Sequence, residues 1–415
     1  IEELIEKQQQ SNLLNEIEIP LANVLASMEN IGFMADKKGI ELFGNALGER
    51  LNKIQQEIYN LVGYEFNINS PKQLGVALFE KLGLPALKKT KSGYSTNADV
   101  LEKLAEEHPV VNYILEYRQL AKLKSTYCDG LIKVIDENGR IHSSFNQTET
   151  RTGRISSTEP NLQNIPVRTE LGKEMRRFFT AKDGCVLVDA DYSQIELRVL
   201  AHIANDNKMC QAFKNKEDIH TITASQVFDM PLEMVTPLMR SRAKAVNFGI
   251  VYGIGAFSLS KDINVSIKEA DRYIKAYLAH YSGVNQYMAS TIEQAKNDGY
   301  VETMFNRRRY LPELSSSNKI TRAFGERVAR NMPIQGTAAD IIKIAMIKVY
   351  NRLKTENLKS RLILQVHDEL IVEAPLDEAE KVATILQEEM ENAVQLNVPL
   401  VADATTGKTW YDAKA

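Results

Sequence analysis

The stretch from Leu362 to Glu373 constrains the fold more than any other part of this chain. Two runs of β-forming residues, 362–366 and 370–373, flank the polar residues 367–369 (His-Asp-Glu), which predicts a buried hairpin with its polar residues at or beside the turn. Adjacent carboxylates between apolar strands need compensation, because burying an unpaired charge is costly. A divalent cation such as Mg²⁺ would provide it. A solvated acidic turn at the surface is the alternative, and the stretch alone does not decide between them.

Composition limits the possible partners. The 415 residues are 44% hydrophobic and 25% charged, which is typical of a soluble globular protein with two or three sub-domains. The chain has no apolar run of membrane-spanning length and no signal sequence at Ile1, so we expect no membrane partner. Three widely spaced cysteines form no metal or disulfide pattern, which favours a reducing cytoplasm. Because the net charge is −3, any positive surface for DNA has to be local.

A second apolar stretch also ends in acids. Residues 185–191 are predicted to form a buried strand that ends at Asp191, with a helix beginning near Ser193. A carboxylate there, matched with Asp368 and Glu369 on another strand, is the arrangement that a two-metal phosphoryl-transfer site requires. The preceding loop, 150–166, is dense in turn formers and side-chain amides, which suit minor-groove edges and the sugar–phosphate backbone.

A helix predicted to begin at residues 236–237 (Thr-Pro) carries a third pattern. Arg240, Lys244, Phe248 and Tyr252 follow at successive i, i+4 steps and therefore share one face. Aromatic residues at this spacing commonly belong to a core, but the two cations on the same stripe argue against burial. A nucleoside triphosphate, which joins a polyanion to a flat ring, would satisfy both halves of the stripe.

Five short motifs follow one another along the chain: 150–166, 191–198, 240–253, 331–340 and 365–369. In this order they resemble the family A DNA polymerases of the bacterial DNA polymerase I type, and the resemblance extends from about residue 15 to Tyr411. It implies an α+β right-hand fold with an antiparallel palm sheet, helical fingers and a helical thumb. Because it begins at the thumb, we expect no 5′-nuclease or 3′–5′ exonuclease domain and no proofreading.

The resemblance also implies a division of the chain. The expected parts are an N-terminal segment and thumb (1–140), the first part of the palm (141–205), the fingers (206–310) and the second part of the palm (311–415). Within them, Pro20 should break the N-terminal helices, 338–353 should form an amphipathic helix, and 399–410 should be the last strand of the sheet. The basic tract 306–310 either lies near DNA or joins fingers to palm, and the sequence leaves both open.

The implied activity is template-directed addition of deoxynucleoside triphosphates to a primer 3′-OH. Two Mg²⁺ ions would be held by Asp191, Asp368 and the carbonyl of Tyr192, with Glu369 in support. The catalytic residues implied are Asp191, Asp368, Glu369, Lys244 and Arg240. The nucleotide-binding residues implied are Gln194, Glu196, His220, Arg240, Lys244, Phe248 and Tyr252. In this set Glu196 would exclude ribonucleotides, and a Phe at position 248 is the family residue that discriminates against dideoxynucleotides.

Primer–template DNA is the other expected partner. The DNA-binding residues implied are Arg154, Gln163, Asn164, Arg327, Asn331, Gln335, His367, Lys72, Arg118, Lys122 and Lys124. The cations at 118, 122 and 124 could follow a phosphate backbone, but a solvated basic face is the commoner meaning of such a run. We expect a monomer in the bacterial cytoplasm, associated with the nucleoid.

Two other functions fit part of the pattern. A single-subunit RNA polymerase shares much of the right-hand fold, although Glu196 beside the sugar argues for deoxynucleotides. A non-catalytic DNA-binding module descended from a polymerase would keep the basic thumb and lose the carboxylates. The three acids and the Arg–Lys stripe are all present, which argues against that loss.

Overall fold

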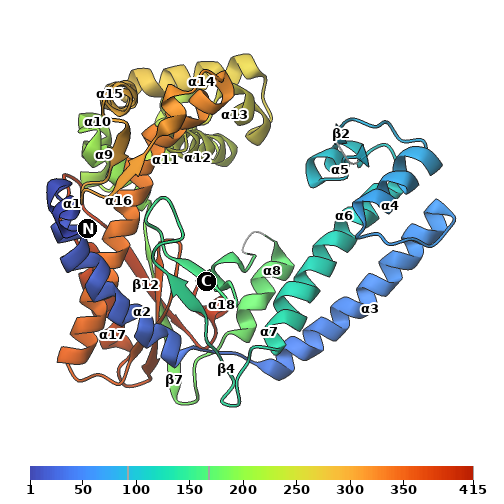
Figure 1. The fold of residues 1–415 in the computed structure, drawn as a ribbon, viewed down its shortest axis with the longest axis horizontal. Helices are drawn as coiled ribbons and strands as arrows, with labels where there is room; N and C mark the ends of the chain where they lie inside the picture. The colour runs from blue at the N-terminus through green and yellow to red at the C-terminus, as the bar shows by residue number, and fades with distance from the viewer. Residues whose placement is uncertain (91–92, 167–168, 415) are drawn as a thin grey trace.

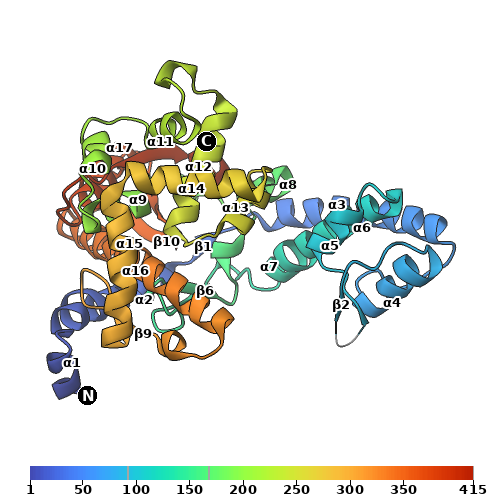
Figure 2. The ribbon, with the colours of Figure 1, turned by 90° about the horizontal axis from the view of Figure 1, so that it is seen from above.

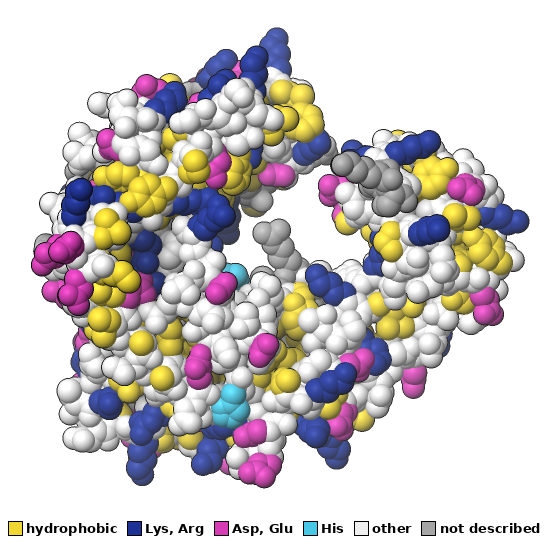
Figure 3. Space-filling model, in the orientation of Figure 1, with side chains coloured by type: hydrophobic (Ala, Val, Ile, Leu, Met, Phe, Trp, Pro, Cys, Tyr) yellow, Lys and Arg dark blue, Asp and Glu magenta, His cyan; other side chains and the backbone are white. Residues whose placement is uncertain are grey.

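The computed structural model describes residues 1–90, 93–166 and 169–414. Figure 1 shows a central sheet, a group of helices above it and a long helical arm to one side. In Figure 3 the surface between the arm and the rest of the molecule is deeply hollowed. The predicted α+β class is confirmed, since the helices surround an antiparallel sheet.

The central sheet contains the predicted hairpin. Its strands are β10 (Arg361–Val366), β11 (Glu369–Pro375), β7 (Cys185–Tyr192) and β12 (Ala402–Gly407), in the order β10-β11-β7-β12. All neighbours are antiparallel, and Glu369 of β11 lies directly opposite Asp191 of β7. The last strand is shorter than the predicted 399–410, because Trp410 begins the short helix α18 (Trp410–Ala413).

The turn of this hairpin is closed without glycine. His367 adopts a left-handed backbone conformation with φ of +53°, which non-glycine residues rarely take. The Gln365 side chain donates a hydrogen bond of 2.7 Å to the His367 carbonyl and thereby fixes the turn. The pairing of Val366 with Glu369 leaves His367 and Asp368 as the loop residues.

One long helix runs beside the sheet, and the prediction of its start was wrong. α16 spans Lys319–Thr355, a length of 37 residues, whereas we expected a helix only from 338. Pro333 and Gly336, which precede the predicted start, both lie inside it. A Cβ at Gly336 would lie 2.6 Å from Thr303 Cγ2, so this glycine permits close packing and does not end the helix.

The N-terminal helices pack on this body. α1 (Glu2–Lys7) is followed by a π-helical segment (Leu13–Glu18) and α2 (Ile19–Ile31), which contacts α16 and β10. Pro20 was predicted to break the helices, but the chain stays helical through it, since α2 continues the π-helical segment without interruption. Glu18 forms ion pairs with Arg307 and, at 2.7 Å, with Lys343.

The arm is a long excursion of the chain. Its elements are α3 (Lys37–Val62), α4 (Pro71–Gly75), a π-helical segment (Val76–Lys81), β2 (Lys89–Thr90), β3 (Gly93–Tyr94), α5 (Ala98–Leu104), α6 (Pro109–Lys122), a second π-helical segment (Leu123–Asp129) and α7 (Gly130–Ile132). α3 packs along α6, and Ser70 caps α4 before Pro71. At the base, β1 (Phe33–Met34) pairs with β4 (Arg140–Ile141).

The helical group lies above the sheet in Figure 1, and Figure 2 shows it from above. It contains α10 (Asn207–Lys214), α11 (Ile219–Phe228), α12 (Pro237–Val251), α13 (Ala256–Asp262), α14 (Ile267–His280) and α15 (Ser282–Asp298). Thr236 caps α12 by accepting a hydrogen bond from the Met239 amide, and Pro237 occupies its first turn. The helical prediction for this region is therefore confirmed.

The remaining elements are short. They are β5 (Ser144–Asn146), β6 (Ser156–Thr158), α8 (Glu170–Met175), α9 (Ile195–Ile203), β8 (Tyr300–Glu302), β9 (Arg308–Tyr310), α17 (Ala379–Glu391) and 3₁₀ turns at Leu162–Asn164, Arg176–Phe178, Leu232–Met234 and Pro312–Ser315. No helix in the described ranges is long and apolar enough to cross a membrane. Arg307 of the basic tract pairs with Asp340, which is fully buried, so this arginine joins elements of the body.

Candidate active site

Three carboxylates converge at the end of the central sheet. Asp191 ends β7, Asp368 lies in the turn, and Glu369 begins β11 opposite Asp191. The Tyr192 amide donates a hydrogen bond of 3.1 Å to the Asp368 carbonyl, which fixes the turn beside the strand end. The predicted meeting of these acids in space therefore takes place.

A fourth acid, which was not among the predicted site residues, lies on the same strand. Asp189 precedes Asp191 by two positions, so both point to the same side of β7. Its side chain is buried, and neither carboxylate oxygen has a hydrogen-bond partner. Burial, with repulsion from Glu369, raises the pKa of Asp189 to about 8. The alternation Asp-Ala-Asp at residues 189–191 was the available signal.

At this edge of the sheet the carboxylates repel one another, and nearby positive side chains do not fully offset their charge. Burial, and then repulsion from Asp191 and Glu196, raises the pKa of Asp368 to about 7. Such a shift means that ionising the carboxyl is unfavourable until positive charge arrives. The acids therefore suit a cation. No group of three or more His, Cys, Asp or Glu side chains in the described ranges could hold a metal alone. Mg²⁺ commonly takes only one or two carboxylates and completes its shell with water and substrate phosphates.

A lysine and a tryptophan among the chain's last residues also contact the acids, and no sequence pattern indicated them. Lys414 Nζ lies 2.9 Å from Asp191 Oδ2 and also pairs with Glu369. Trp410 Nε1 donates a hydrogen bond of 3.0 Å to the other Glu369 oxygen. The Arg176 guanidinium stacks on the Trp410 ring, 4.4 Å from its centroid.

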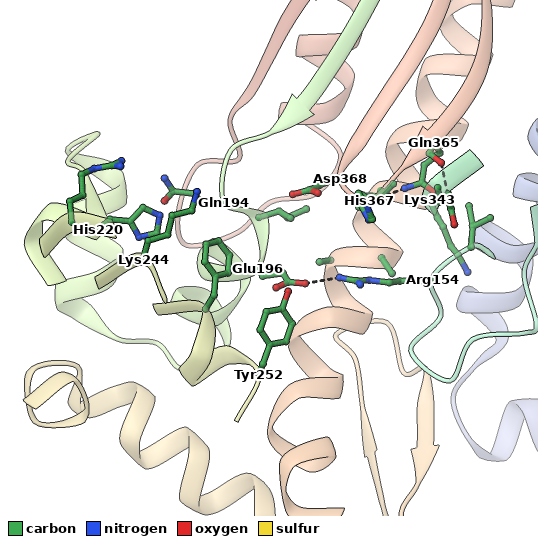
Figure 4. A pocket seen from close by; sticks show the side chains of 18 residues that line it. Arg154, Gln194, Glu196, His220, Lys244, Tyr252, Lys343, Gln365, His367 and Asp368 are labelled. Carbon is green, nitrogen blue, oxygen red and sulfur yellow. Dashed lines mark hydrogen bonds and ion pairs between the residues drawn. The ribbon is translucent and has the colours of Figure 1, made fainter. Parts of the chain in front are cut away.

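A pocket of about 580 Å³ adjoins the acids and is shown in Figure 4. Arg240, Lys244 and Phe248 of α12 all line it together with Tyr252, the residue that follows the helix, as the i, i+4 spacing predicted. Asp368 lines the opposite side. A positive and aromatic helix face therefore meets the acidic sheet edge across one cavity.

His220 lies beneath the cations of α12. It is 2% exposed, and its Nδ1 is 2.9 Å from the Asn247 amide nitrogen. Burial lowers the pKa of His220 to about 4, so the ring is neutral at neutral pH. Arg240 Nε forms an ion pair of 2.6 Å with Asp218 Oδ2. Burial opposes ionisation of Asp218, but the hydrogen bond from Arg240 holds its pKa at about 2.

Glu196 is 8% exposed in the first turn of α9, whose start at Ile195 is two residues later than predicted. Its Oε1 accepts a hydrogen bond of 2.7 Å from Arg154 Nη2, and the Tyr252 hydroxyl points toward the carboxylate in Figure 4. Burial raises the pKa of Glu196, while Arg154 and Tyr252 lower it. The carboxylate is thus a fixed wall of the pocket. Gln194, just before it, also lines the pocket.

The amide loop contributes another wall. Gln163 Nε2 donates hydrogen bonds to the Gln365 carbonyl at 3.1 Å and to its side chain at 3.2 Å. His367 and Gln163 line the pocket, whereas Asn164 does not. The Asn164 carbonyl instead accepts a hydrogen bond from the Tyr127 hydroxyl. Gln365 was part of a recognised motif but was not among the predicted site residues.

Other predicted DNA contacts lie away from the pocket. Arg327, Asn331 and Gln335 lie on α16 and are absent from its lining. The arm carries the rest: Lys72, Arg118, Lys122 and Lys124. Two of these arm cations have internal partners, since Arg118 donates to Thr96 and Lys124 pairs with Asp129 at 2.8 Å. Lys122 and Lys72 are exposed.

Comparisons with known proteins agree with this geometry. The profile described as DNA polymerase family A matches residues 37–412. DNA polymerase I of Geobacillus stearothermophilus is 54% identical over 412 residues, and that of Bacillus subtilis is 52% identical over 413. Each alignment covers 99% of this chain and 47% of the relative, so the chain spans about half the length of these relatives.

A solved structure is also similar. The polymerase domain of Pol1 from M. smegmatis, in complex with DNA primer-template and dNTP, superposes with a TM-score of 0.94 at 42% identity. The match covers 99% of this chain and 73% of that one. This agreement confirms the right-hand arrangement that the sequence motifs implied.

Proposed function

This chain belongs to DNA polymerase family A, and we propose that it adds deoxynucleotides to a primer 3′-OH under the direction of a template. The observation that carries the proposal is the pocket itself. Within it the Arg240–Tyr252 face of α12 lies across from Asp368 at the acidic edge of the sheet. Positive charge for a triphosphate and carboxylates for divalent cations thus flank one space large enough for a nucleotide.

In this proposal α12 binds the triphosphate. Arg240 and Lys244 neutralise the phosphate charge that grows as the bond to the leaving pyrophosphate breaks. Lys244 is also placed to protonate that pyrophosphate. His220, neutral in its buried position, offers a hydrogen bond without adding charge. Phe248 lies against the sugar and base, and Tyr252 against the template–primer stack.

The carboxylates fit Mg²⁺, because Asp189 is buried without a hydrogen-bond partner and the half-buried Asp368 has its pKa raised by its surroundings. Asp191, Asp368 and the Tyr192 carbonyl would hold two ions, and Glu369 would orient them from behind. Bound there, Mg²⁺ supplies positive charge that favours ionisation of the primer 3′-OH and stabilises the pyrophosphate. The chain's own contribution is a fixed geometry: the register between Asp191 and Glu369 sets the spacing of the acids.

Primer–template DNA would occupy the hollow between the arm and the body seen in Figure 3. We propose that Arg154, Gln163 and His367 contact the newest base pair and the primer end, and that Asn331 and Gln335 face the minor groove. The arm would hold the duplex through exposed cations such as Lys72 and Lys122. The expected domain boundaries remain proposals. The packing of α2 on α16 supports an N-terminal segment that ends before α3, with the thumb beginning at α3.

Primer extension tests the function. Asp191→Ala and Asp368→Ala should each slow extension by roughly three orders of magnitude or more, since several kcal/mol of transition-state stabilisation is lost. Primer–template affinity should stay nearly unchanged in both variants. Asp183→Ala, which removes an exposed carboxylate before the other end of β7, is the matched control. Extension in Mg²⁺ near the wild-type rate by either active-site variant would refute the assignment.

The same assay separates the alternatives. An RNA polymerase-like enzyme would prefer ribonucleotides, and a non-catalytic module would bind DNA without extending it. We also propose that this chain does not proofread, because its clustered carboxylates are accounted for by synthesis. A mismatched primer incubated with Mg²⁺ and no nucleotides should keep its length, and clean shortening that Asp368→Ala abolishes would contradict this. A monomeric state and a cytoplasmic, nucleoid-associated location stay proposals.

A further inference from the structure

The ammonium group of Lys414 occupies the acidic edge of the sheet. Its Nζ lies 2.9 Å from Asp191 Oδ2 and pairs with Glu369 as well. In the part of the chain that the structure describes, no other lysine or arginine forms an ion pair with either acid. Lys414 thus bridges Asp191, which we propose to hold metal, and Glu369, which we propose to support it.

The backbone that carries Lys414 is firmly anchored. Trp410 is fully buried, its amide donates to the Phe179 carbonyl at 2.8 Å, and its ring packs on Phe33 and Phe179 with centroids 6.0 and 5.7 Å apart. The Ala413 carbonyl accepts a hydrogen bond from Thr405 of β12. α18 is therefore part of the body, and it delivers Lys414 to a defined place.

The two contacts of Lys414 differ in access to solvent. The Asp191 side chain is 44% exposed, whereas that of Glu369 is 5% exposed. A contact at an exposed carboxylate exchanges with water or ions far more easily than one at a buried carboxylate, because the buried group has no alternative partner. The Lys414–Asp191 contact is the one that can open.

We propose that Lys414 is an internal counter-ion that holds Asp191 in the metal-free protein and releases it when a divalent cation binds. Its contact with Glu369 persists, so the side chain pivots and does not leave. Lys414 is therefore a positioning residue that sets the concentration of divalent cation at which the site fills. The inference rests on the proposed function, in which Asp191 holds metal.

Manganese binding without DNA or nucleotide tests this, with Mn²⁺ followed by electron paramagnetic resonance. Lys414→Met keeps a side chain of similar length and removes its charge, so Asp191 becomes free for the ion. Its Kd for Mn²⁺ should fall by about three- to tenfold, the size expected when a competing, partly exposed ion pair is removed. Lys414→Arg should stay near the wild type. Lys408→Met is the control, because Lys408 contacts the carbonyls of Lys182 and Cys185 at the other end of β7.

Thermal unfolding gives a second readout. In EDTA the acids of Lys414→Met lack their counter-ion, so its Tm should lie below that of the wild type, and Mg²⁺ should raise it more. If Lys414→Met folds poorly, Lys414→Gln replaces it. An unchanged or weaker Mn²⁺ affinity in the folded variant would overturn the inference. Equal Mn²⁺ binding by Asp191→Ala and the wild type would instead refute the proposed metal site.

Discussion

Replacing Glu196 by alanine should let ribonucleotides into the active site. The carboxylate is 8% exposed and held by Arg154 at 2.7 Å, so it forms a rigid polar wall where we place the nucleotide sugar. A 2′-hydroxyl there would collide with the carboxylate or displace its hydrogen-bond partner Arg154.

The structure sets the size of the effect. Leaving a buried polar group unpaired costs about 1–3 kcal/mol, which corresponds to a factor of about 5–150 in selectivity. Glu196→Ala should lower the preference for deoxynucleotides over ribonucleotides by a factor in this range. Stability should change little or increase, because burial raises the pKa of Glu196 and the folded protein therefore disfavours its ionised form.

Single-nucleotide incorporation with matched deoxy and ribo substrates measures the ratio of kcat/KM values, and urea unfolding measures stability. Glu233→Ala, an exposed glutamate in the same protein, is the control. If Glu196 only complemented the N-terminus of α9, its loss would lower stability by roughly 0.3–1 kcal/mol and leave sugar selectivity unchanged. That pair of results would refute the reasoning.

Four further predictions follow from the same contacts. Lys244→Ala should slow single-turnover chemistry and weaken nucleotide binding, whereas Lys72→Ala should weaken only DNA binding; a change confined to DNA affinity in the first variant would contradict the assignment. Phe248→Tyr should reduce discrimination against dideoxynucleotides in competition assays, since a phenolic hydroxyl can replace the missing 3′-OH; an unchanged ratio would place this residue elsewhere. Folding lowers the pKa of His220 from 6.5 to about 4, so the folded protein disfavours the protonated ring. The stability that this difference contributes, up to about 3 kcal/mol, is fully present above pH 6.5 and is lost as the pH falls toward 4. Denaturant titrations at several pH values should show that the stability of His220→Gln lacks this decrease between pH 6.5 and 4. Asp340→Ala should destabilise the protein by roughly 1–3 kcal/mol, because Arg307, which keeps Glu18 as a second partner, and Thr303 each lose a bond to the buried carboxylate; unchanged stability would contradict this.

The sequence predicted elements whose cause is local. The hairpin around Asp368 follows from runs of β-forming residues, and the α12 stripe follows from i, i+4 spacing, so both were found. The start of α16 was missed because Gly336 is normally a weak helix residue, and only its close contact with Thr303 explains its place. Pro20 misled because the chain changes from π-helical to α-helical beside it and does not leave the helix.

Contacts between distant residues could not be predicted in the same way. The pairing of Arg154 with Glu196 spans 42 positions, and that of Lys414 with Asp191 spans 223. Neither leaves a periodic pattern, because a single cation anywhere in the chain can reach an acid once the fold is made. Asp189 is different: its place on the strand was predictable, and its importance became clear only from its burial without partners.

The two strands at the base of the arm pair with each other, so the arm can be exchanged as a unit. The chain enters at Phe33–Met34 and leaves at Arg140–Ile141, and these residues are hydrogen-bonded neighbours. Entry and exit are therefore as close as two strands of a hairpin, about 5 Å between paired Cα atoms. A short turn could close the body after excision, and the arm of a related polymerase could be spliced in at the same junction without moving the acids of the central sheet. The arm and the body can thus be engineered separately.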